Sequence, residues 1–106
     1  MTRPQARVVF TAAPARPLAG SAAAAEVTER ALATAVILLS AEQVGGAQRC
    51  LDMSVDYAKV RVQFGRPIGS FQAIKHKCAD MLLAVESARS AAYYAASALD
   101  GASAAD

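Results

Sequence analysis

Apolar residues recur at helical spacing along two long stretches of the chain. The first runs from about Ala22 to Lys59. Its apolar positions are Val27, Ala31, Leu32, Ala35, Leu38, Leu39, Val44, Ala47, Leu51, Val55 and Ala58. Gly20 or Ser21 can cap this stretch, and no strong breaker follows before Gly65. The pattern therefore predicts one helix of roughly 55 Å, at about 1.5 Å per residue.

The second stretch follows a turn. Ser70 is expected to be the N-cap of a helix that begins near Phe71, and Asp100-Gly101 is expected to end it, with a frayed tail to Asp106. Its apolar stripe consists of Ile74, Cys78, Met81, Leu82, Val85, Ala88, Ala92, Ala95 and Leu99. A short turn makes consecutive helices antiparallel neighbours. The predicted fold class is all-α: a long antiparallel helical hairpin, as in half of a helical bundle, preceded by a short extended or β segment.

The first predicted helix has two unusual regions. Residues 33–40 are apolar on all sides apart from Thr34 and Ser40, so we expect protein to surround them on most sides. Gly45-Gly46 costs about 1 kcal/mol of helix propensity per glycine relative to alanine. The pair predicts either a close approach of another backbone or ligand, or a local kink or break, and the pattern does not decide between them.

The later part of this helix carries a polar stripe of Arg49, Asp52, Asp56 and Lys59. The pairs Arg49/Asp52 and Asp56/Lys59 are three residues apart, where an ion pair adds little stability. We interpret the stripe as a solvated face without chemistry.

A β-prone run, Ala6–Thr11, and a proline-punctuated stretch, Pro14–Gly20, precede the helices. No other segment offers this run a partner strand, and an isolated strand is not stable. Either the run is disordered, or its sheet belongs to protein outside this chain.

Length and composition indicate a dependent domain. The chain has 106 residues, of which 55% are hydrophobic, but many of these are alanine and none is tryptophan. A chain of this size has room for one small domain. We therefore expect it to be part of something larger, through oligomerisation, a missing partner segment, or both.

Charge and cysteine content exclude several classes of function. The net charge of +2 argues against nucleic-acid binding, although Lys75, Lys77, Arg61 and Arg66 leave it as a minor alternative. The two cysteines, at positions 50 and 78, lack metal-ligand spacing and are expected to be buried free thiols in a reducing compartment. No apolar run reaches the roughly 20 residues of a membrane span, and no signal-peptide core is present. A cytoplasmic location is expected.

The turn between the helices is the candidate site. Arg61 can complement the end of the first helix, or its planar fork can bind phosphate. Phe64 offers an exposed aromatic face, and Gln72 adds amide donors beside the free N–H groups of a helix start. These groups predict either a plain turn or a site for the pyrophosphate and ring of a nucleotide. His76, between two lysines, is expected to be solvated, and no conventional catalytic or metal-binding set is present.

Four segments carry a family resemblance: Ala41–Gln48, Tyr57–Ile68, Phe71–Ile74 and Ala79–Met81. With the ordered core RxQFGxPIxxFQ, the chain resembles the acyl-CoA dehydrogenase family. The match covers about Ser21 to Leu99 and corresponds to the first two long helices of the C-terminal helical domain. It implies that residues 21–106 are part of that domain and that residues 1–20 resemble the end of the middle β-domain.

The resemblance implies an FAD-dependent oxidoreductase of lipid catabolism. Such an enzyme oxidises an acyl-CoA thioester at Cα–Cβ and passes the electrons to an acceptor flavoprotein. The implied cofactor-binding residues are Arg61 on the FAD pyrophosphate, Phe64 packed by the cofactor, Phe71 and Gln72 at the start of the next helix, and Gln63 nearby. In the family this turn reaches the FAD of a neighbouring subunit, so a homo-oligomer, dimer or tetramer, is also implied.

Departures from the family pattern affect the expected activity. In the family the usual catalytic base is a glutamate, which would lie beyond Asp106. Some members carry the base on the first long helix instead, but that position is Ala35 here. The next position is often an arginine in the family, and here it is Val36. No catalytic residue is therefore assigned, and the chain is expected to be a fragment that is inactive alone. The alternative reading is a non-enzymatic helical hairpin that acts as a structural or interaction module.

Overall fold

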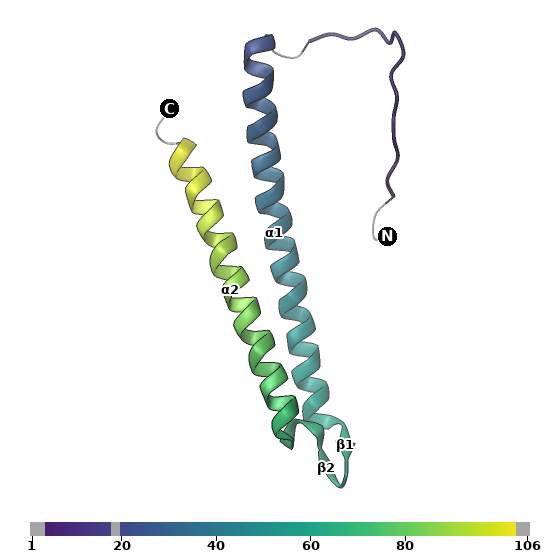
Figure 1. Ribbon diagram of the computed structural model, residues 1–106, viewed down its shortest axis with the longest axis vertical. Coiled ribbons are helices and arrows are strands. Elements are labelled where there is room, and N and C mark those ends of the chain that lie inside the picture. Colours follow the sequence, from purple (N-terminus) through teal and green to yellow (C-terminus); the bar gives the residue numbers. More distant parts are fainter. Residues whose placement is uncertain (1–3, 18–19, 104–106) are drawn as a thin grey trace.

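Two long antiparallel helices joined by a compact turn make up the body of the protein (Figure 1). A computed structural model describes residues 4–17 and 20–103. In chain order, its elements are α1 (Ser21–Val60), β1 (Val62–Gln63), β2 (Arg66–Pro67), the 3-10 turn η1 (Ile68–Ser70) and α2 (Gln72–Ser103). The helical hairpin predicted from the periodicity is confirmed.

Helix α1 runs without a break through its glycine pair. Gly20 is the N-cap, and its carbonyl accepts from the N–H groups of Ala23 and Ala24 at 3.0 and 3.1 Å. A Cβ built on Gly45 or Gly46 would meet nothing within 4 Å, so no described backbone approaches either glycine. Neither alternative for the pair is therefore seen here: the helix is not broken, and the space beside the glycines is open.

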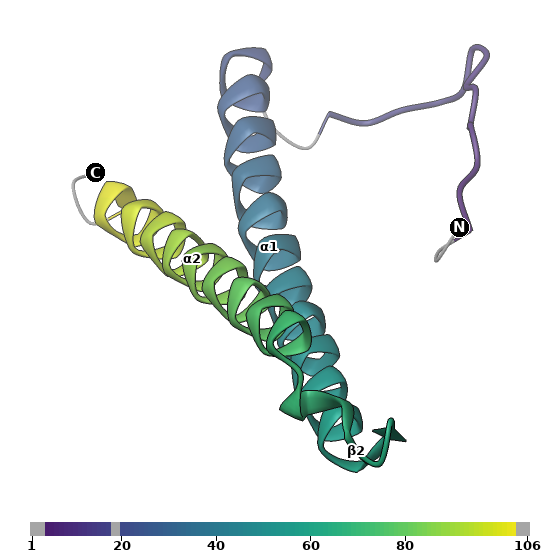
Figure 2. The same ribbon diagram turned by 60° about the horizontal axis from the view of Figure 1, so that its bottom comes forward.

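The core is small and lies near the turn. Leu51 and Ala58 on α1 and Val85 on α2 are the buried apolar residues, each 5–6% exposed. Away from the turn the helices diverge, as Figures 1 and 2 both show. The radius of gyration of 22.0 Å compares with about 13 Å for a compact domain of 100 residues.

The divergence leaves the apolar middle of α1 uncovered within this chain, so the described residues do not supply the protein that was expected to surround residues 33–40. Val36, Leu38 and Leu39 are 49–65% exposed, because α2 has moved away from α1 at that height. Thr34 and Ser40 bond to the carbonyls four residues earlier, at 2.9 and 2.8 Å, so their hydroxyls need no external partner.

One hydrogen bond between side chains links the two helices in the described part of the chain. Arg89 on α2 donates to Gln48 on α1 at 2.6 Å and also bonds Glu86 at 3.3 Å. Gln48 in turn donates to Asp52 at 2.8 Å. Thus Asp52 has Gln48 as its hydrogen-bond partner, where the sequence suggested Arg49.

The polar stripe of α1 is exposed, as expected. Its second predicted pair is present, with Lys59 Nζ 3.6 Å from an Asp56 carboxylate oxygen and both side chains about 70% exposed. An ion pair in water contributes little to stability, so this one fits a solvated face.

Three local predictions are wrong. Ser70 does not cap α2: its hydroxyl donates to the Pro67 carbonyl at 2.7 Å and so closes η1. Helix α2 does not stop at Asp100-Gly101 but continues to Ser103, since glycine within a helix costs only about 1 kcal/mol. Cys50 is exposed and not buried, because it lies on a face of α1 that α2 does not cover; Cys78 is half-buried, and both thiols are free.

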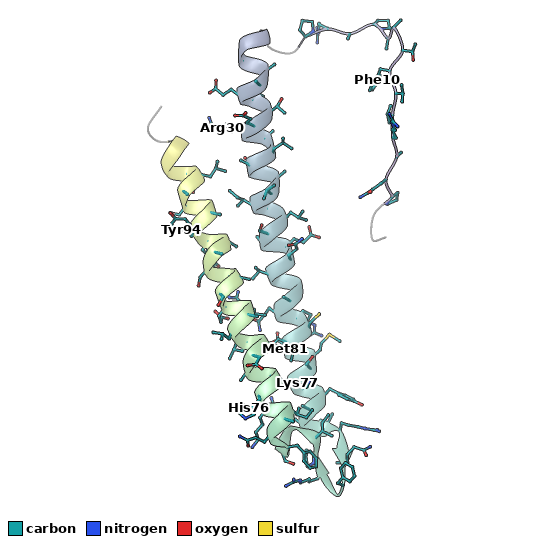
Figure 3. The ribbon with its side chains drawn as sticks, in the orientation of Figure 1. Phe10, Arg30, His76, Lys77, Met81 and Tyr94 are labelled. Atoms are coloured by element: carbon teal, nitrogen blue, oxygen red, sulfur yellow. The ribbon has the colours of Figure 1, made fainter. Side chains whose placement is uncertain are left out.

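The segment before the helices is extended and exposed. Residues 4–10 form no strand with any described residue, and Val8, Val9 and Phe10 are 68–80% exposed. Figure 3 places Phe10 far from both helices. The predictions for residues 1–3, 18–19 and 104–106 lie outside the described residues. Among the residues that are described, no helix has both the length and the apolarity to cross a membrane.

Candidate functional site

A miniature β-hairpin forms the tip of the turn, which the sequence pattern did not predict. Strands β1 and β2 pair antiparallel, with Val62 opposite Pro67 and Gln63 opposite Arg66. The Ile68 N–H closes the loop by donating to the Arg61 carbonyl at 2.7 Å. The chain between the helices is therefore a hydrogen-bonded structure and not a loose loop.

Phe64 and Gly65 make the two-residue loop of this hairpin. Their φ angles are +54° and +75°, and loops of type I′ need positive φ at both positions. Glycine adopts such angles freely, whereas a bulky residue does so at a cost. The Phe64 side chain is nevertheless 91% exposed. A strained, exposed aromatic residue is of the kind that clusters at binding sites.

Phe71 brings the hairpin against the start of α2. Its ring meets the Phe64 ring edge to face, with centroids 6.1 Å apart and planes at 86°. The Arg66 guanidinium carbon lies 4.2 Å from the centroid of the Phe71 ring. Both contacts are attractive, the first between aromatic quadrupoles and the second between a cation and a π face. They orient the exposed ring of Phe64 relative to α2.

Arg61 places its positively charged guanidinium at the junction of α1 and the hairpin. Its N–H donates to the Tyr57 carbonyl at 2.9 Å, which ends α1, and its carbonyl accepts from Ile68. The side chain is exposed and has no ion pair within the described residues. A backbone fixed at both ends thus carries a guanidinium that is available to an anion.

The start of α2 supplies donors beside this cation. The Phe71 carbonyl accepts from the N–H groups of Ile74 and Lys75, both at 3.1 Å. The N–H groups of Gln72 and Ala73 precede these first bonds and have no acceptor within the helix. A helix N-terminus with free N–H groups favours negative charge.

A glycine fixes the whole turn on α1. A Cβ built on Gly69 would lie 2.9 Å from the Ala58 carbonyl oxygen and 3.3 Å from its carbonyl carbon. Only a residue without a side chain permits this approach. Since Ala58 is buried in the last turns of α1, the contact sets how η1 and the hairpin sit against the helix.

The structure brings together four of the five predicted cofactor-binding residues through contacts or adjacency. Phe64 touches Phe71, Gln72 follows Phe71, and Gln63 lies opposite Arg66, whose guanidinium covers Phe71. Arg61 stands at the base of the same hairpin. The expected exposure of Phe64 and position of Gln72 in the first turn of α2 are both confirmed.

Two residues of the cluster were missed as site residues. Arg66 reaches Phe71 because the hairpin folds back at residues 64 and 65. The glycine at position 65, typical of a two-residue hairpin loop, could have indicated this fold-back in the sequence. His76 is solvated as predicted, but its ring also meets the Gln72 side chain, with the two Nε2 atoms 3.1 Å apart. The spacing of four residues on one helix could have indicated that contact.

The cluster suits a ligand that is both anionic and aromatic. A free guanidinium and helix N–H groups bind phosphate oxygens, while the exposed Phe64 ring offers a surface for a planar group. The carboxylates of the described residues are exposed, and no three potential ligands gather there for a metal ion. Within the described residues, the arrangement therefore offers groups that could bind such a ligand.

Comparison with known proteins gives a family match over most of the chain. The family model described as "Acyl-CoA dehydrogenase, C-terminal domain" matches residues 21–105. Acyl-CoA dehydrogenase IpdE2 of Mycobacterium tuberculosis is 64% identical over 56 residues, which are 53% of this chain and 18% of that protein. Acyl-CoA dehydrogenase FadE34 of the same organism is 50% identical over 93 residues, 88% of this chain and 12% of that protein.

A plant relative extends the comparison. Mitochondrial isovaleryl-CoA dehydrogenase of Oryza sativa is 49% identical over 57 residues, which are 54% of this chain and 14% of that protein. The chain thus spans less than a fifth of the length of each of these relatives. No solved structure matches it.

Proposed function

The chain belongs to the acyl-CoA dehydrogenase family, and on that premise we propose that its turn, Arg61–Gln72, forms part of an FAD site. The enzyme in question would be a flavoprotein that oxidises an acyl-CoA thioester at Cα–Cβ. One observation carries the proposal: a guanidinium without an ion pair among the described residues, an aromatic pair whose outer ring is exposed, and a helix N-terminus are gathered in a turn that Gly69 fixes against α1.

Each residue has a proposed role that follows from its chemistry. Arg61 binds the pyrophosphate, because its guanidinium has no ion pair among the described residues and its backbone is anchored. Phe64 packs against the cofactor, with Phe71 supporting it from behind. Gln72 offers its amide beside the free N–H groups of α2, and Gln63 lies on the neighbouring strand. If these residues hold FAD, the cofactor would supply the hydride acceptor for oxidation of the acyl-CoA.

The oligomer is proposed from the uncovered apolar surface. The first half of α1 exposes Leu32, Val36 and Leu38 by 61–65%, and Tyr93 on α2 is 71% exposed. Such a surface is costly in water. Further helices of the enzyme, from the same or a neighbouring subunit, would cover it. A homo-oligomer, an acyl-CoA substrate and an acceptor flavoprotein are therefore parts of the proposal.

No residue of the described chain is proposed as the catalytic base. Ala35 carries only a methyl group, and no carboxylate is enclosed in an apolar site. We propose that these 106 residues by themselves bind cofactor without dehydrogenating acyl-CoA.

The alternative is a helical hairpin that serves as a structural or interaction module without a cofactor. It is supported by the small core and the large exposed apolar surface. The two functions differ in one observable property, which is flavin binding.

Titration of the purified, flavin-free protein with FAD tests the proposal. Binding is followed by the change in flavin fluorescence and visible absorbance, and circular dichroism verifies that the helices are present. The proposal predicts saturable binding of FAD. A helical protein that binds no FAD would contradict it and favour the structural module.

A further inference from the structure

A side-chain contact at the start of α2 joins Gln72 to a residue outside the proposed cofactor site. Gln72 Nε2 lies 3.1 Å from His76 Nε2, and the two residues are four positions apart on one helix. Both side chains are exposed, and His76 lies on the side of α2 that faces away from α1 in Figure 3. The contact is therefore made by α2 alone.

The direction of this hydrogen bond follows from the atoms involved. An amide nitrogen can only donate, so the Nε2 atom of His76 must accept. Acceptance requires a neutral imidazole that carries its proton on Nδ1. In this state, the Gln72 amide gives one N–H to the ring, and its carbonyl oxygen is left for other partners.

Protonation of His76 reverses the requirement. Both nitrogens of an imidazolium donate, so the ring can no longer accept from the Gln72 amide. A half-turn of the amide lets its oxygen accept from the ring, and this hydrogen bond is strengthened by the charge. The NH2 group of Gln72 then points away from the ring, beside the free N–H groups of the first turn.

We infer that His76 is a positioning residue that sets which end of the Gln72 amide is presented to an anionic flavin nucleotide. With His76 protonated, the amide adds a donor to the phosphate-binding groups; with His76 neutral and its proton on Nδ1, the amide presents a carbonyl oxygen that phosphate does not favour. The inference rests on the proposed FAD site. It predicts tighter flavin binding towards acid pH.

Other titratable groups surround this end of α2. The turn η1 has no titratable side chain. The charged and titratable groups on the surrounding elements are Lys75, Lys77, Cys78 and Asp80 on α2; Asp56, Tyr57 and Lys59 near the end of α1; Arg61 at the junction; and Arg66 on β2. Histidine is the side chain that ordinarily changes charge between about pH 5 and pH 8. A pH profile in that range that disappears in His76→Gln therefore reports His76.

The test measures the dissociation constant of FAD between about pH 5.5 and pH 8. For the unmodified protein, affinity should rise roughly two- to tenfold towards acid pH, which is the contribution of one hydrogen bond. His76→Gln keeps a hydrogen-bonding partner without a charge change, so its profile should be flat. His76→Arg donates at all pH values, so it should hold the acid-side affinity throughout. Lys75→Gln removes a neighbouring cation and should keep the profile.

A second readout does not depend on flavin. In the flavin-free protein labelled with 15N, the side-chain amide resonances of Gln72 should move with pH in step with the His76 ring resonances. His76→Gln should abolish this movement.

The outcomes separate the inference from the function on which it rests. If FAD binds with a flat pH profile, or if the Gln72 amide does not follow His76, the inference is wrong and the FAD site stands. If FAD does not bind at any pH, the proposed function fails, and the inference fails with it.

Discussion

Gly69 and Ala58 approach so closely that a Cβ on the glycine would lie 2.9 Å from the alanine's carbonyl oxygen. The atom in the way belongs to the backbone of α1, which cannot move aside as a flexible side chain could. The position of the turn relative to the helix pair therefore depends on the absence of a side chain at one residue.

Gly69→Ala should destabilise the hairpin and displace the turn. Overpacking a site of this kind costs about 1–3 kcal/mol, and the displacement should also weaken FAD binding. Urea unfolding followed by circular dichroism measures the first effect, and FAD titration measures the second. Unchanged stability would show that η1 can shift away from Ala58 without loss.

Gly46→Ala is the matched control and a prediction in itself. The space beside Gly46 is open, and the residue lies in mid-helix. Alanine should therefore stabilise α1 by up to about 1 kcal/mol. A loss of stability would instead indicate that another part of the protein packs against this glycine, which is one of the two interpretations that the glycine pair first suggested.

Arg89→Met should lower the free energy of unfolding by about 1 kcal/mol, because it removes the hydrogen bond to Gln48 between the helices while keeping the length of the side chain. Glu86→Gln is the control: it alters a half-exposed ion pair and leaves the bond between the helices in place, so the change should stay within about 0.5 kcal/mol. Equal effects of the two substitutions in chemical denaturation would contradict this assignment.

Phe64→Asn should separate stability from binding. Asparagine tolerates the positive φ at this position and, followed by glycine, suits the hairpin loop. This relief should offset the lost contact with Phe71, so thermal stability should change little. FAD affinity should fall by about fivefold, the value of one aromatic contact near 1 kcal/mol. Phe64→Tyr keeps the ring and should keep the affinity; a variant Phe64→Asn that binds FAD normally would remove Phe64 from the site.

Much of the fold follows from local patterns in the sequence. Long runs of apolar residues at helical spacing locate α1 and α2 to within a few residues, because each helix is bonded within itself. The glycines and the proline between the two helices predict the turn. The exposure of Phe64 was expected because few residues near it could cover the ring.

Other features depend on geometry that no local pattern carries. Strands of two residues are too short to show alternation, so the hairpin of β1 and β2 was missed. Ser70 has the residue type of an N-cap, yet the 3-10 turn uses its hydroxyl first. The apolar face of α1 near Val36 is exposed because the two helices diverge, and their angle depends on packing at the turn.

The FAD affinity of Arg61→Ala, compared with that of Lys59→Ala, tests the proposed cofactor site most directly. Both substitutions remove one exposed cation near the end of α1, but only Arg61 stands in the turn with its guanidinium free, whereas Lys59 is paired with Asp56. Arg61→Ala should weaken FAD binding roughly tenfold or more, the value of a charge-assisted hydrogen bond to phosphate, and Lys59→Ala should leave the affinity unchanged. Equal affinities for the two variants and the unmodified protein would contradict a phosphate-binding role for the turn.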